Sequence, residues 1–303
     1  MSIGLALGSG SARGWAHIGV IRALAEAGIE PDIICGTSMG ALVGAAHAAG
    51  NLDALETWAR SVSHLDTARF LRLRSADKGL IGTERFDDFL QKYVAEESVL
   101  IERLDRPYAA VATALFSGRE RWLTEGSLLD AVRASTALPG LLPPRRHGDD
   151  WLVDGGLVNP VPVSVCRALG ADLVIAVNLN RDMAGKRFLE RQAESRQDDD
   201  ADDGDEDEGG LLARVGNFVS ERFGSDGDEA PGLLDSMASA IHITQERITG
   251  ARIGGDPPDV TLNPRLRDVG LLELYRARES IAEGRACVER MREEIDHVID
   301  TRT

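Results

Sequence analysis

The stretch that decides the fold of this 303-residue chain is Ile3-Gly4-Leu5-Ala6-Leu7-Gly8-Ser9-Gly10, continued by Ile33-Ile34-Cys35-Gly36-Thr37-Ser38-Met39-Gly40. Each part is a short apolar run that ends in a loop of glycine and serine, which predicts a buried strand followed by a tight turn. Between them, apolar residues recur at helical spacing over 16–27, and Gly28 ends that run. Small apolar residues after Gly40 predict a second helix. This order predicts a right-handed βαβ unit on a parallel sheet.

The two loops are expected to face one cavity, because parallel strands leave their carboxyl ends at the same edge of a sheet. Adjacent strands lie about 4.8 Å apart, so the loops would be close neighbours. Acyl chemistry by a serine needs an exposed hydroxyl and backbone N–H donors directed at the developing oxyanion. The pattern Gly36-x-Ser38-x-Gly40 offers Ser38 as the nucleophile, and the N–H of Met39 follows it at the start of a helix. The alternative is an ordinary turn in which Ser38 only caps that helix.

The glycine-rich loop 8–14 has three interpretations. A dinucleotide-binding fingerprint requires Gly-x-Gly-x-x-Gly, but Arg13 stands at the third glycine position and no acidic residue ends the second strand. A nucleotide-binding P-loop requires Gly-Lys-Ser/Thr, which this loop lacks. The interpretation that remains is an oxyanion loop.

A serine nucleophile needs a base, and the six histidines are the usual candidates: His17, His47, His64, His147, His242 and His297. None of them follows a late strand in a convincing loop. An α/β-hydrolase also places more strands before its serine than the 37 residues here allow. Asp154 is the better candidate, since it ends the apolar run 151–153 and precedes Gly155-Gly156. The alternative for Asp154 is a hairpin turn of the Asp-Gly type.

The rest of the chain continues the alternation of strands and helices. Apolar runs predict strands at 108–115, 120–124, 151–153, 172–179 and 260–262, with 172–179 central in the sheet, and a short helix at 128–134. Helical stripes follow at Leu234, Met237, Ala238, Ile241 and Ile248, and then, as one long terminal helix, at Leu274, Ile281, Val288 and Ile295. We expect the terminal stripe to be core, with an oligomer seam as the alternative. The simplest organisation is a single domain over 1–303, in which 233–303 packs on the core.

Charge and glycine dominate 181–231, which predicts a flexible acidic insertion. Nine acidic residues fall within 198–208, leaving −7 of the net charge of −16 for the rest of the chain. An apolar stripe at 211–223 predicts a helix that packs on the body, and the alternative is a lid or a helix in transient contact with a membrane surface. The moderately acidic body argues against nucleic acid as a partner, because nucleic-acid binding needs a basic face.

Three cysteines, Cys35, Cys166 and Cys287, lie far apart in the sequence. They offer neither a zinc-binding spacing nor a disulfide framework, which favours a reducing compartment. No basic and apolar leader precedes the first strand, and no apolar run is long enough to span a bilayer. We therefore expect a cytoplasmic protein that needs no metal and no other cofactor.

Motifs spread over the chain together resemble a known family, the patatin-like phospholipases, and most closely its bacterial RssA-type group. They are the opening segment 3–19 with Arg13-Gly14 and His17-Ile18-Gly19-Val20, the turn Gly36–Gly40, Arg133-Ala134-Ser135 with Leu138-Pro139-Gly140, and 151–162 with Asp154-Gly155-Gly156. The resemblance covers nearly the whole chain. It implies a three-layer α/β/α patatin-like sandwich around a central, mostly parallel sheet.

In that family a serine and an aspartate form a catalytic dyad without histidine. The resemblance therefore implies Ser38 as the nucleophile and Asp154 as the base that accepts its proton. It also implies an oxyanion hole made of backbone N–H groups from the glycine-rich loop and from Met39. The loop residues in this predicted set are Gly8, Ser9, Gly10, Ser11, Arg13 and Gly14. Ser9 and Ser11 stand where many relatives have glycine, and they narrow the backbone angles that the loop can adopt.

These residues together predict a serine hydrolase of lipid-like acyl esters, a phospholipase, lysophospholipase or carboxylesterase, that works through an acyl-enzyme. Its expected partner is the lipid or acyl-ester substrate. Two alternatives stay open. The acyl-enzyme could pass its acyl group to an alcohol or thiol, as an acyltransferase does, or the protein could be a regulatory interaction module with little turnover.

Overall fold

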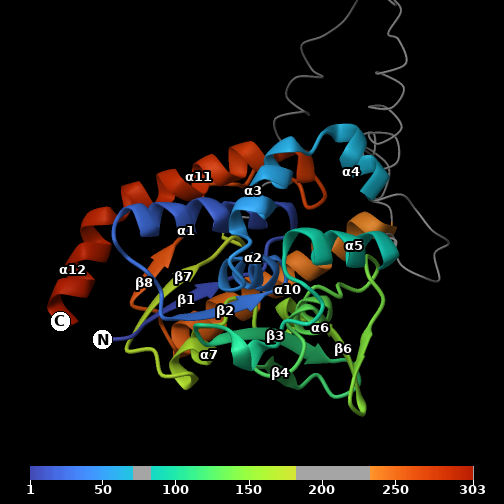
Figure 1. Cartoon of the computed structure of the whole chain (residues 1–303), viewed down its shortest axis with the longest axis horizontal. Helices are drawn as coiled ribbons and strands as arrows, with labels where there is room; N and C mark the ends of the chain where they lie inside the picture. Colours follow the sequence, from blue (N-terminus) through green and yellow to red (C-terminus); the bar gives the residue numbers. More distant parts are fainter. Residues whose placement is uncertain (71–82, 182–232, 303) are drawn as a thin grey trace, which may run out of the picture.

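The computed structural model describes residues 1–70, 83–181 and 233–302 (Figure 1). The strands are β1 Ile3–Leu7, β2 Ile33–Thr37, β3 Tyr108–Ala114, β4 Glu120–Leu123, β5 Arg145–His147, β6 Asp150–Asp154, β7 Leu173–Val177 and β8 Val260–Leu262. The α-helices are α1 Ala16–Glu26, α2 Met39–Ala48, α3 Leu52–Ser61, α4 His64–Phe70, α5 Thr83–Tyr93, α6 Leu128–Ser135, α7 Val163–Ala168, α10 Leu233–Gly255, α11 Ala277–Arg290 and α12 Arg292–Arg302. Two 3₁₀ turns matter for the site, η1 Ser11–Trp15 and η4 Gly155–Leu157.

The strands form one sheet in the order β5-β6-β3-β2-β1-β7-β8, and β4 pairs with β3 outside this path. β1 pairs in parallel with β2 and with β7, β2 with β3, and β7 with β8. The expected βαβ unit of neighbouring parallel strands is therefore confirmed, with Leu7 opposite Gly36 at the ends of β1 and β2. The strand predicted at 172–179 to be central corresponds to β7. It pairs with a strand on each side, β1 and β8, but the three-residue β8 is the edge strand, so β7 lies next to the edge of the sheet.

β2 and β6 meet end to end along one edge of β3. Val111 of β3 pairs with Thr37, the last residue of β2, and the next residue, Ala112, pairs with Asp154, the last residue of β6. β4 occupies the opposite edge of β3 along 110–113, so β2 and β6 share the remaining edge. Because β6 runs antiparallel to β3 and β2 runs parallel to it, the carboxyl ends of β2 and β6 point toward each other.

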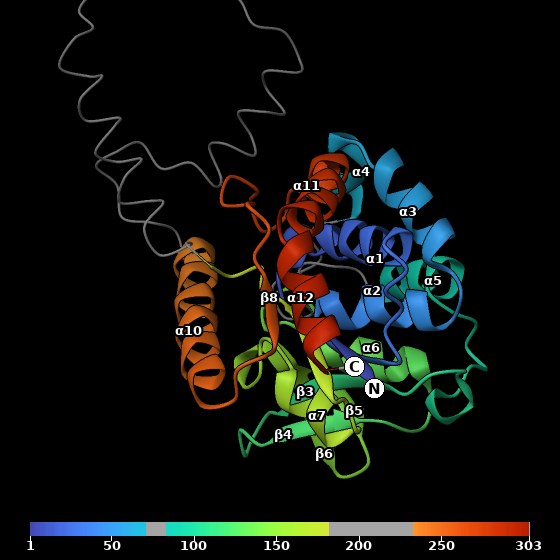
Figure 2. The same ribbon diagram turned by 90° about the vertical axis from the view of Figure 1, so that its left-hand side faces the viewer.

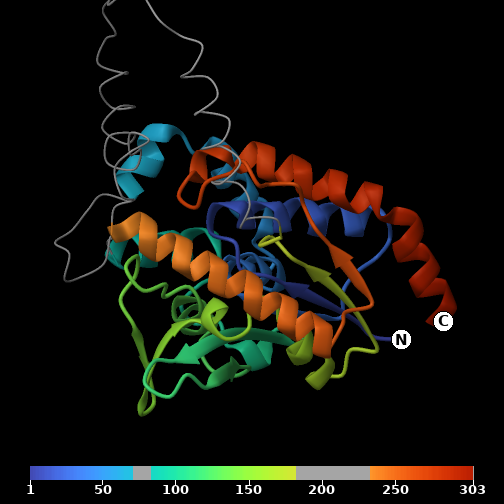
Figure 3. The same cartoon turned by 180° about the vertical axis from the view of Figure 1, so that it is seen from behind.

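Helices cover both faces of the sheet, as the predicted three-layer arrangement requires. Successive strand residues face opposite sides: Leu5 and Leu7 of β1 join the larger apolar cluster beneath α1, α2 and α11, and Ala6 joins a smaller one beneath α7. Figures 1 and 2 show α1 and α11 side by side on the first face, with α7 on the second. The helix α10 lies apart from both layers and crosses the molecule on the side that Figure 3 turns toward the viewer.

The carboxyl-terminal region departs from the prediction of one long helix. It forms α11 and α12, which are separated at Met291, where the backbone leaves helical angles with φ −102° and ψ 7°. The break is needed because α11 packs along α1, whereas α12 turns toward β8. The predicted core role of the stripe is confirmed, since Ile281, Val288 and Ile295 are buried.

Two predictions cannot be compared with the structure. Apart from Arg181, the predicted acidic insertion 181–231 lies outside the described residues, and so does the predicted helix at 211–223. Among the described helices, none combines the length and the apolar composition that crossing a bilayer requires.

Candidate active site

Ser38 lies in the turn between β2 and α2, at the carboxyl end of β2. Its backbone angles, φ 57° and ψ −122°, are rare for a residue other than glycine. Such a strained strand-to-helix turn presents a serine hydroxyl at the edge of a sheet. Gly40 makes the turn possible, because a Cβ atom there would lie 2.1 Å from the carbonyl oxygen of Leu7 in β1.

The Ser38 hydroxyl does not cap the helix that follows it. Ser38 occupies the N-cap position of α2, but its side chain accepts no capping hydrogen bond. Instead, Oγ of Ser38 donates a hydrogen bond to Oδ2 of Asp154 over 2.5 Å. These two residues are 116 positions apart in the sequence, and the end-to-end arrangement of β2 and β6 on β3 brings them together.

Asp154 is held at four of its atoms. Its second carboxylate oxygen, Oδ1, accepts the N–H of Gly156 over 2.7 Å, which caps the η4 turn. Its own N–H donates to the carbonyl of Ala137 (3.0 Å), and its carbonyl accepts from Oγ1 of Thr113 (2.8 Å). The alternative of a two-residue Asp-Gly hairpin is not what the structure has, because Gly155 and Gly156 open the η4 turn.

Burial changes the acidity of Asp154. The side chain is only 1% exposed, and removal from water raises the pKa of its carboxyl group to about 6. The hydrogen bonds from Ser38 and Gly156 act in the opposite direction, since they stabilise the carboxylate. A carboxylate with this pKa is a stronger base than an ordinary aspartate and is still ionised at neutral pH.

Helix α6 supports the serine turn from the side. The N–H of Ser38 donates to Oγ of Ser135, the last residue of α6, over 2.9 Å. Arg133 fixes the same helix, because its buried guanidinium forms ion pairs with Asp87 of α5 (2.8 Å) and with Glu97 (2.8 Å). The Arg133-Ala134-Ser135 motif therefore positions the backbone of Ser38.

The first residues of the glycine-rich loop are fixed by hydrogen bonds to the neighbouring chain. The N–H of Gly8 donates to the carbonyl of Val177 in β7 (3.0 Å), and the N–H of Ser9 donates to that of Pro160 (2.8 Å). The hydroxyl of Ser9 accepts from the side-chain amide of Asn180 (3.0 Å). The loop thus leaves the sheet in a defined direction.

His17 anchors this loop from the other side. Its Nε2 lies 2.7 Å from the carbonyl oxygen of Gly8. Complete burial lowers the pKa of His17 to about 4, so the ring is neutral and its Nε2–H donates to that carbonyl. No histidine is a hydrogen-bond partner of the Ser38 or Asp154 side chain in the described part of the chain.

The amides that remain unpaired are those of Gly10, Ser11 and Met39, none of which donates a hydrogen bond to any described residue. Ser11 adopts a left-handed backbone angle, φ 48°, which is the conformation that glycine would take more easily. Three of the other amides in the predicted set already have hydrogen-bond partners in the structure. The amides of Gly8 and Ser9 are engaged as described, and that of Arg13 donates to the carbonyl of Gly10 (3.1 Å).

Arg13 and Gly14 hold the loop against its surroundings. The guanidinium of Arg13 is fully buried, and its Nε donates to the carbonyl of Gly10 over 3.3 Å. Burial without a described acidic partner lowers the pKa of Arg13 to about 10. A Cβ atom on Gly14 would lie 2.4 Å from Cβ of Met39, so the loop and the start of α2 are in direct contact.

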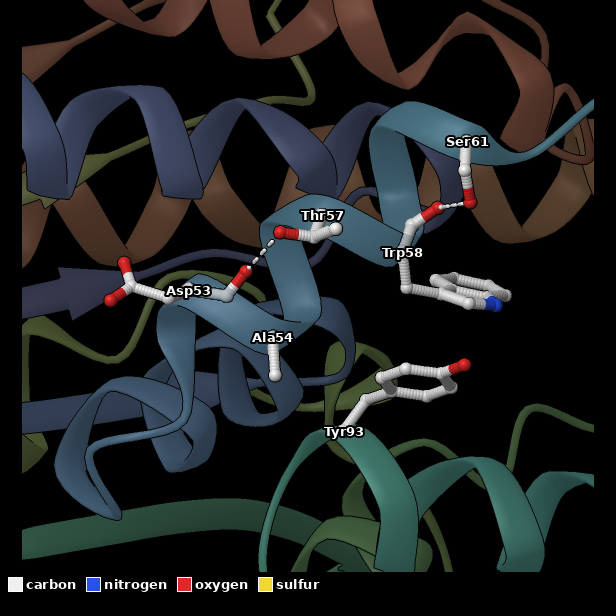
Figure 4. A pocket seen from close by; sticks show the side chains of 6 residues that line it. All are labelled: Asp53, Ala54, Thr57, Trp58, Ser61 and Tyr93. Atoms are coloured by element: carbon white, nitrogen blue, oxygen red, sulfur yellow. Dashed lines mark hydrogen bonds between the residues drawn. The ribbon is translucent and has the colours of Figure 1, made fainter.

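A pocket of about 440 Å³ lies elsewhere, between α3 and the end of α5 (Figure 4). It is lined by Asp53, Ala54, Thr57, Trp58, Ser61 and Tyr93, none of which is a predicted site residue. Two of its hydroxyl groups are bonded within α3, from Thr57 to the carbonyl of Asp53 (2.8 Å) and from Ser61 to that of Trp58 (2.7 Å). The ring of Trp58 contacts Trp15, which directly follows the glycine-rich loop, at 5.7 Å between centroids.

Sequence reasoning missed several residues that hold the site. Ser135 belongs to the Arg133-Ala134-Ser135 motif, which is the available signal for it. His17 was considered as a candidate base, and the structure has its Nε2 at the carbonyl of Gly8 instead. Asn180 carried no signal, because it lies beyond an apolar strand and its contact with Ser9 joins positions 171 apart.

Comparisons with known proteins agree with this architecture. The family model described as patatin-like phospholipase matches residues 5–167, more than half of the chain, and this range contains the glycine-rich loop, Ser38 and Asp154. The chain is 44% identical over 183 residues to an uncharacterized NTE family protein of Mycobacterium tuberculosis, a match that covers 60% of this chain and 50% of that protein.

Two animal proteins are also similar. Patatin-like phospholipase domain-containing protein 7 of Mus musculus is 36% identical over 185 residues, and patatin-like phospholipase domain-containing protein ZK370.4 of Caenorhabditis elegans is 40% identical over 185 residues. Each match covers 59% of this chain and 14% of the animal protein. The matched region thus spans half or less of these relatives. Because the family model matches more than half of the chain, including both Ser38 and Asp154, the chain belongs to the patatin-like phospholipase family.

Proposed function

We propose that this protein is a serine hydrolase of lipid acyl esters in which Ser38 is the nucleophile and Asp154 is the base. The observation that carries the proposal is the 2.5 Å hydrogen bond from Oγ of Ser38 to the buried carboxylate of Asp154. The family supplies the substrate class, because its described members are patatin-like phospholipases.

In the first half of the proposed reaction, Oγ of Ser38 attacks the ester carbonyl carbon while its proton passes to Oδ2 of Asp154. The carbonyl oxygen becomes negative as the tetrahedral intermediate forms. The unpaired amides of Gly10, Ser11 and Met39 are the donors available to that oxyanion. Met39 begins α2, so the positive end of the helix dipole adds to its effect.

The intermediate then collapses, and the proton on Asp154 passes to the leaving alkoxide oxygen. This step leaves an acyl group on Ser38 and restores the Asp154 carboxylate. A water molecule then attacks the acyl-enzyme while Asp154 accepts its proton, and Asp154 returns that proton to Oγ of Ser38 as the C–O bond to the serine breaks and the fatty acid leaves. A pKa of about 6 suits both roles, since the group is ionised at neutral pH and returns the proton readily.

Labelling with a fluorophosphonate probe tests the nucleophile. The wild-type protein should be labelled, and Ser38→Ala should lose both the label and the hydrolysis of a short-chain fatty-acyl ester. Ser61→Ala is the matched control, because its hydroxyl is exposed and bonded only within α3. Labelling that persists in Ser38→Ala would remove Ser38 from the mechanism. Product analysis with added glycerol separates hydrolysis from acyl transfer, because a transferase would form a new ester.

A further inference from the structure

Helix α10 lies across both loops of the proposed site. One face of the helix makes three contacts at helical spacing. His242 approaches the guanidinium of Arg13, with Nδ1 and Nη2 3.4 Å apart. Ten residues further along, Nε of Arg252 donates to the carbonyl of Val158, just after η4, over 2.8 Å. Gln245 lies between these two contacts, beside Gly156.

The buried face of α10 is polar, which the apolar stripe in its sequence does not predict. Between residues 239 and 255, Gln245 and Thr249 are the two buried residues, and Ile243 is half exposed. Thr249 is satisfied within the helix, because its Oγ1 donates to the carbonyl of Gln245 over 2.7 Å. Gln245 is different. Its side chain is 5% exposed, and its carboxamide forms no hydrogen bond with any described residue.

The carboxamide of Gln245 lies directly beside Asp154. A Cβ atom placed on Gly156 would be 2.3 Å from Nε2 of Gln245 and 3.0 Å from Oδ1 of Asp154. The distance between Nε2 of Gln245 and Oδ1 of Asp154 is therefore no greater than the sum of these two distances. Any side chain larger than hydrogen at position 156 would displace Gln245 from this place.

The carboxamide of Gln245 has little exposed area, yet neither its nitrogen nor its oxygen is among the fully enclosed polar atoms that lack a partner, so it keeps access to solvent. A carboxamide that stays accessible beside Asp154 and binds no described protein group can hydrogen-bond to a ligand. The other elements of the site indicate which part of a ligand comes here.

We infer that Gln245 binds the alcohol half of the ester substrate, by a hydrogen bond to a hydroxyl or another polar group next to the ester oxygen. The inference rests on the proposed function. Asp154 must deliver its proton to the leaving oxygen, so that oxygen lies within hydrogen-bond distance of the carboxylate. The carbonyl oxygen lies at the amides of Gly10, Ser11 and Met39. Polar atoms on the alcohol carbons are thus the substrate atoms within reach of Gln245, and glycerol esters carry such atoms.

The test compares two esters of one fatty acid, glyceryl octanoate and propyl octanoate, in the wild-type protein and in Gln245→Leu. For the glyceryl ester, kcat/KM should fall about tenfold to hundredfold, whereas for the propyl ester it should stay within about twofold. Arg247→Ala is the matched control, since Arg247 is exposed on the same helix. An equal loss for both esters, or no loss for either, would overturn the inference.

A second variant tests the placement of Gln245 even if Gln245→Leu does not fold. Gln245→Glu keeps the size of the side chain and adds a negative charge beside Asp154, which disfavours ionisation of the Asp154 carboxyl. The acid limb of the rate profile for propyl octanoate should move to higher pH, and an unmoved limb would contradict the placement. If the wild-type protein hydrolyses neither ester, the proposed function fails first, and that outcome is distinct from an unchanged ester preference.

Discussion

Replacing Asp154 by asparagine should abolish turnover and, at the same time, make the protein more stable at alkaline pH. The reason is the cost of keeping a charged carboxylate buried. Burial raises the pKa of Asp154 from 3.8 to about 6 in the folded protein. A difference of one pKa unit corresponds to about 1.36 kcal/mol, so the ionised form costs the folded state about 3 kcal/mol.

Removing the buried charge does not add all of this free energy to the stability of the variant. Asparagine keeps a carbonyl oxygen for the N–H of Gly156, but it replaces the charged acceptor of the Ser38 hydroxyl with an amide. Subtracting about 1 kcal/mol for that hydrogen bond leaves a net gain of about 2 kcal/mol. For a chain of 303 residues this corresponds to a rise in melting temperature of about 3 °C.

The sign of the effect depends on pH. Below pH 3.8 both folded and unfolded states carry the proton, so the charge contributes nothing. As pH rises toward 6, the unfolded state loses the proton before the folded state does, and the wild-type protein loses stability relative to the variant. Above pH 6 the difference is complete.

Thermal unfolding of both proteins at pH 4 and pH 8, followed by circular dichroism, measures this difference. Asp149→Asn is the control for removing one negative charge, because Asp149 is exposed in the turn between β5 and β6. The reasoning is refuted if Asp154→Asn melts below the wild type at pH 8, or if the two proteins differ by the same amount at both pH values.

Three further results are expected. Ser38→Gly should remove activity while the free energy of unfolding, measured by urea unfolding, changes by less than about 1 kcal/mol, because the relief of strain at φ 57° offsets the loss of the hydrogen bond to Asp154. The value of kcat/KM should fall below about pH 6, where protonated Asp154 accepts no proton; a profile flat from pH 7 to pH 5 would contradict Asp154 as the base. Gly14→Ala should displace Met39, and kcat should then fall about tenfold or more with little change in KM. Gly250→Ala is the control, because a Cβ atom there meets no atom within 4 Å, and it should leave both constants unchanged.

The sequence predicted the elements around the candidate site that depend on local pattern. Apolar runs, loop glycines and the turn around Ser38 follow from side-chain and backbone preferences within a few residues. The predicted strands 3–7 and 33–35 therefore agree closely with β1 and β2. Ser38 and Asp154 each follow an apolar run, and the structure joins the two strand ends by a hydrogen bond.

Other features depend on contacts between distant segments, and local pattern carries no signal for them. The loop from Gly8 to Gly14 offered many amides, but pairing with β7 and with Pro160 occupies two of them. The apolar stripe of α10 predicted a helix correctly, yet the face that meets the site carries Gln245. The break at Met291 likewise follows from two packing partners in different directions.

The end-to-end arrangement of β2 and β6 on β3 also bears on how this site tolerates changes in chain length. Thr37, which directly precedes the serine, and Asp154 pair with neighbouring residues of one strand, Val111 and Ala112, about 3.3 Å apart along it. Insertions in the surface loops between Ser38 and Asp154 would leave their spacing unchanged. Deleting one residue within β3 would shift the two ends by one pairing step and turn one of them to the other face of the sheet. Among homologous chains, loop lengths should therefore vary freely while the length of β3 should not.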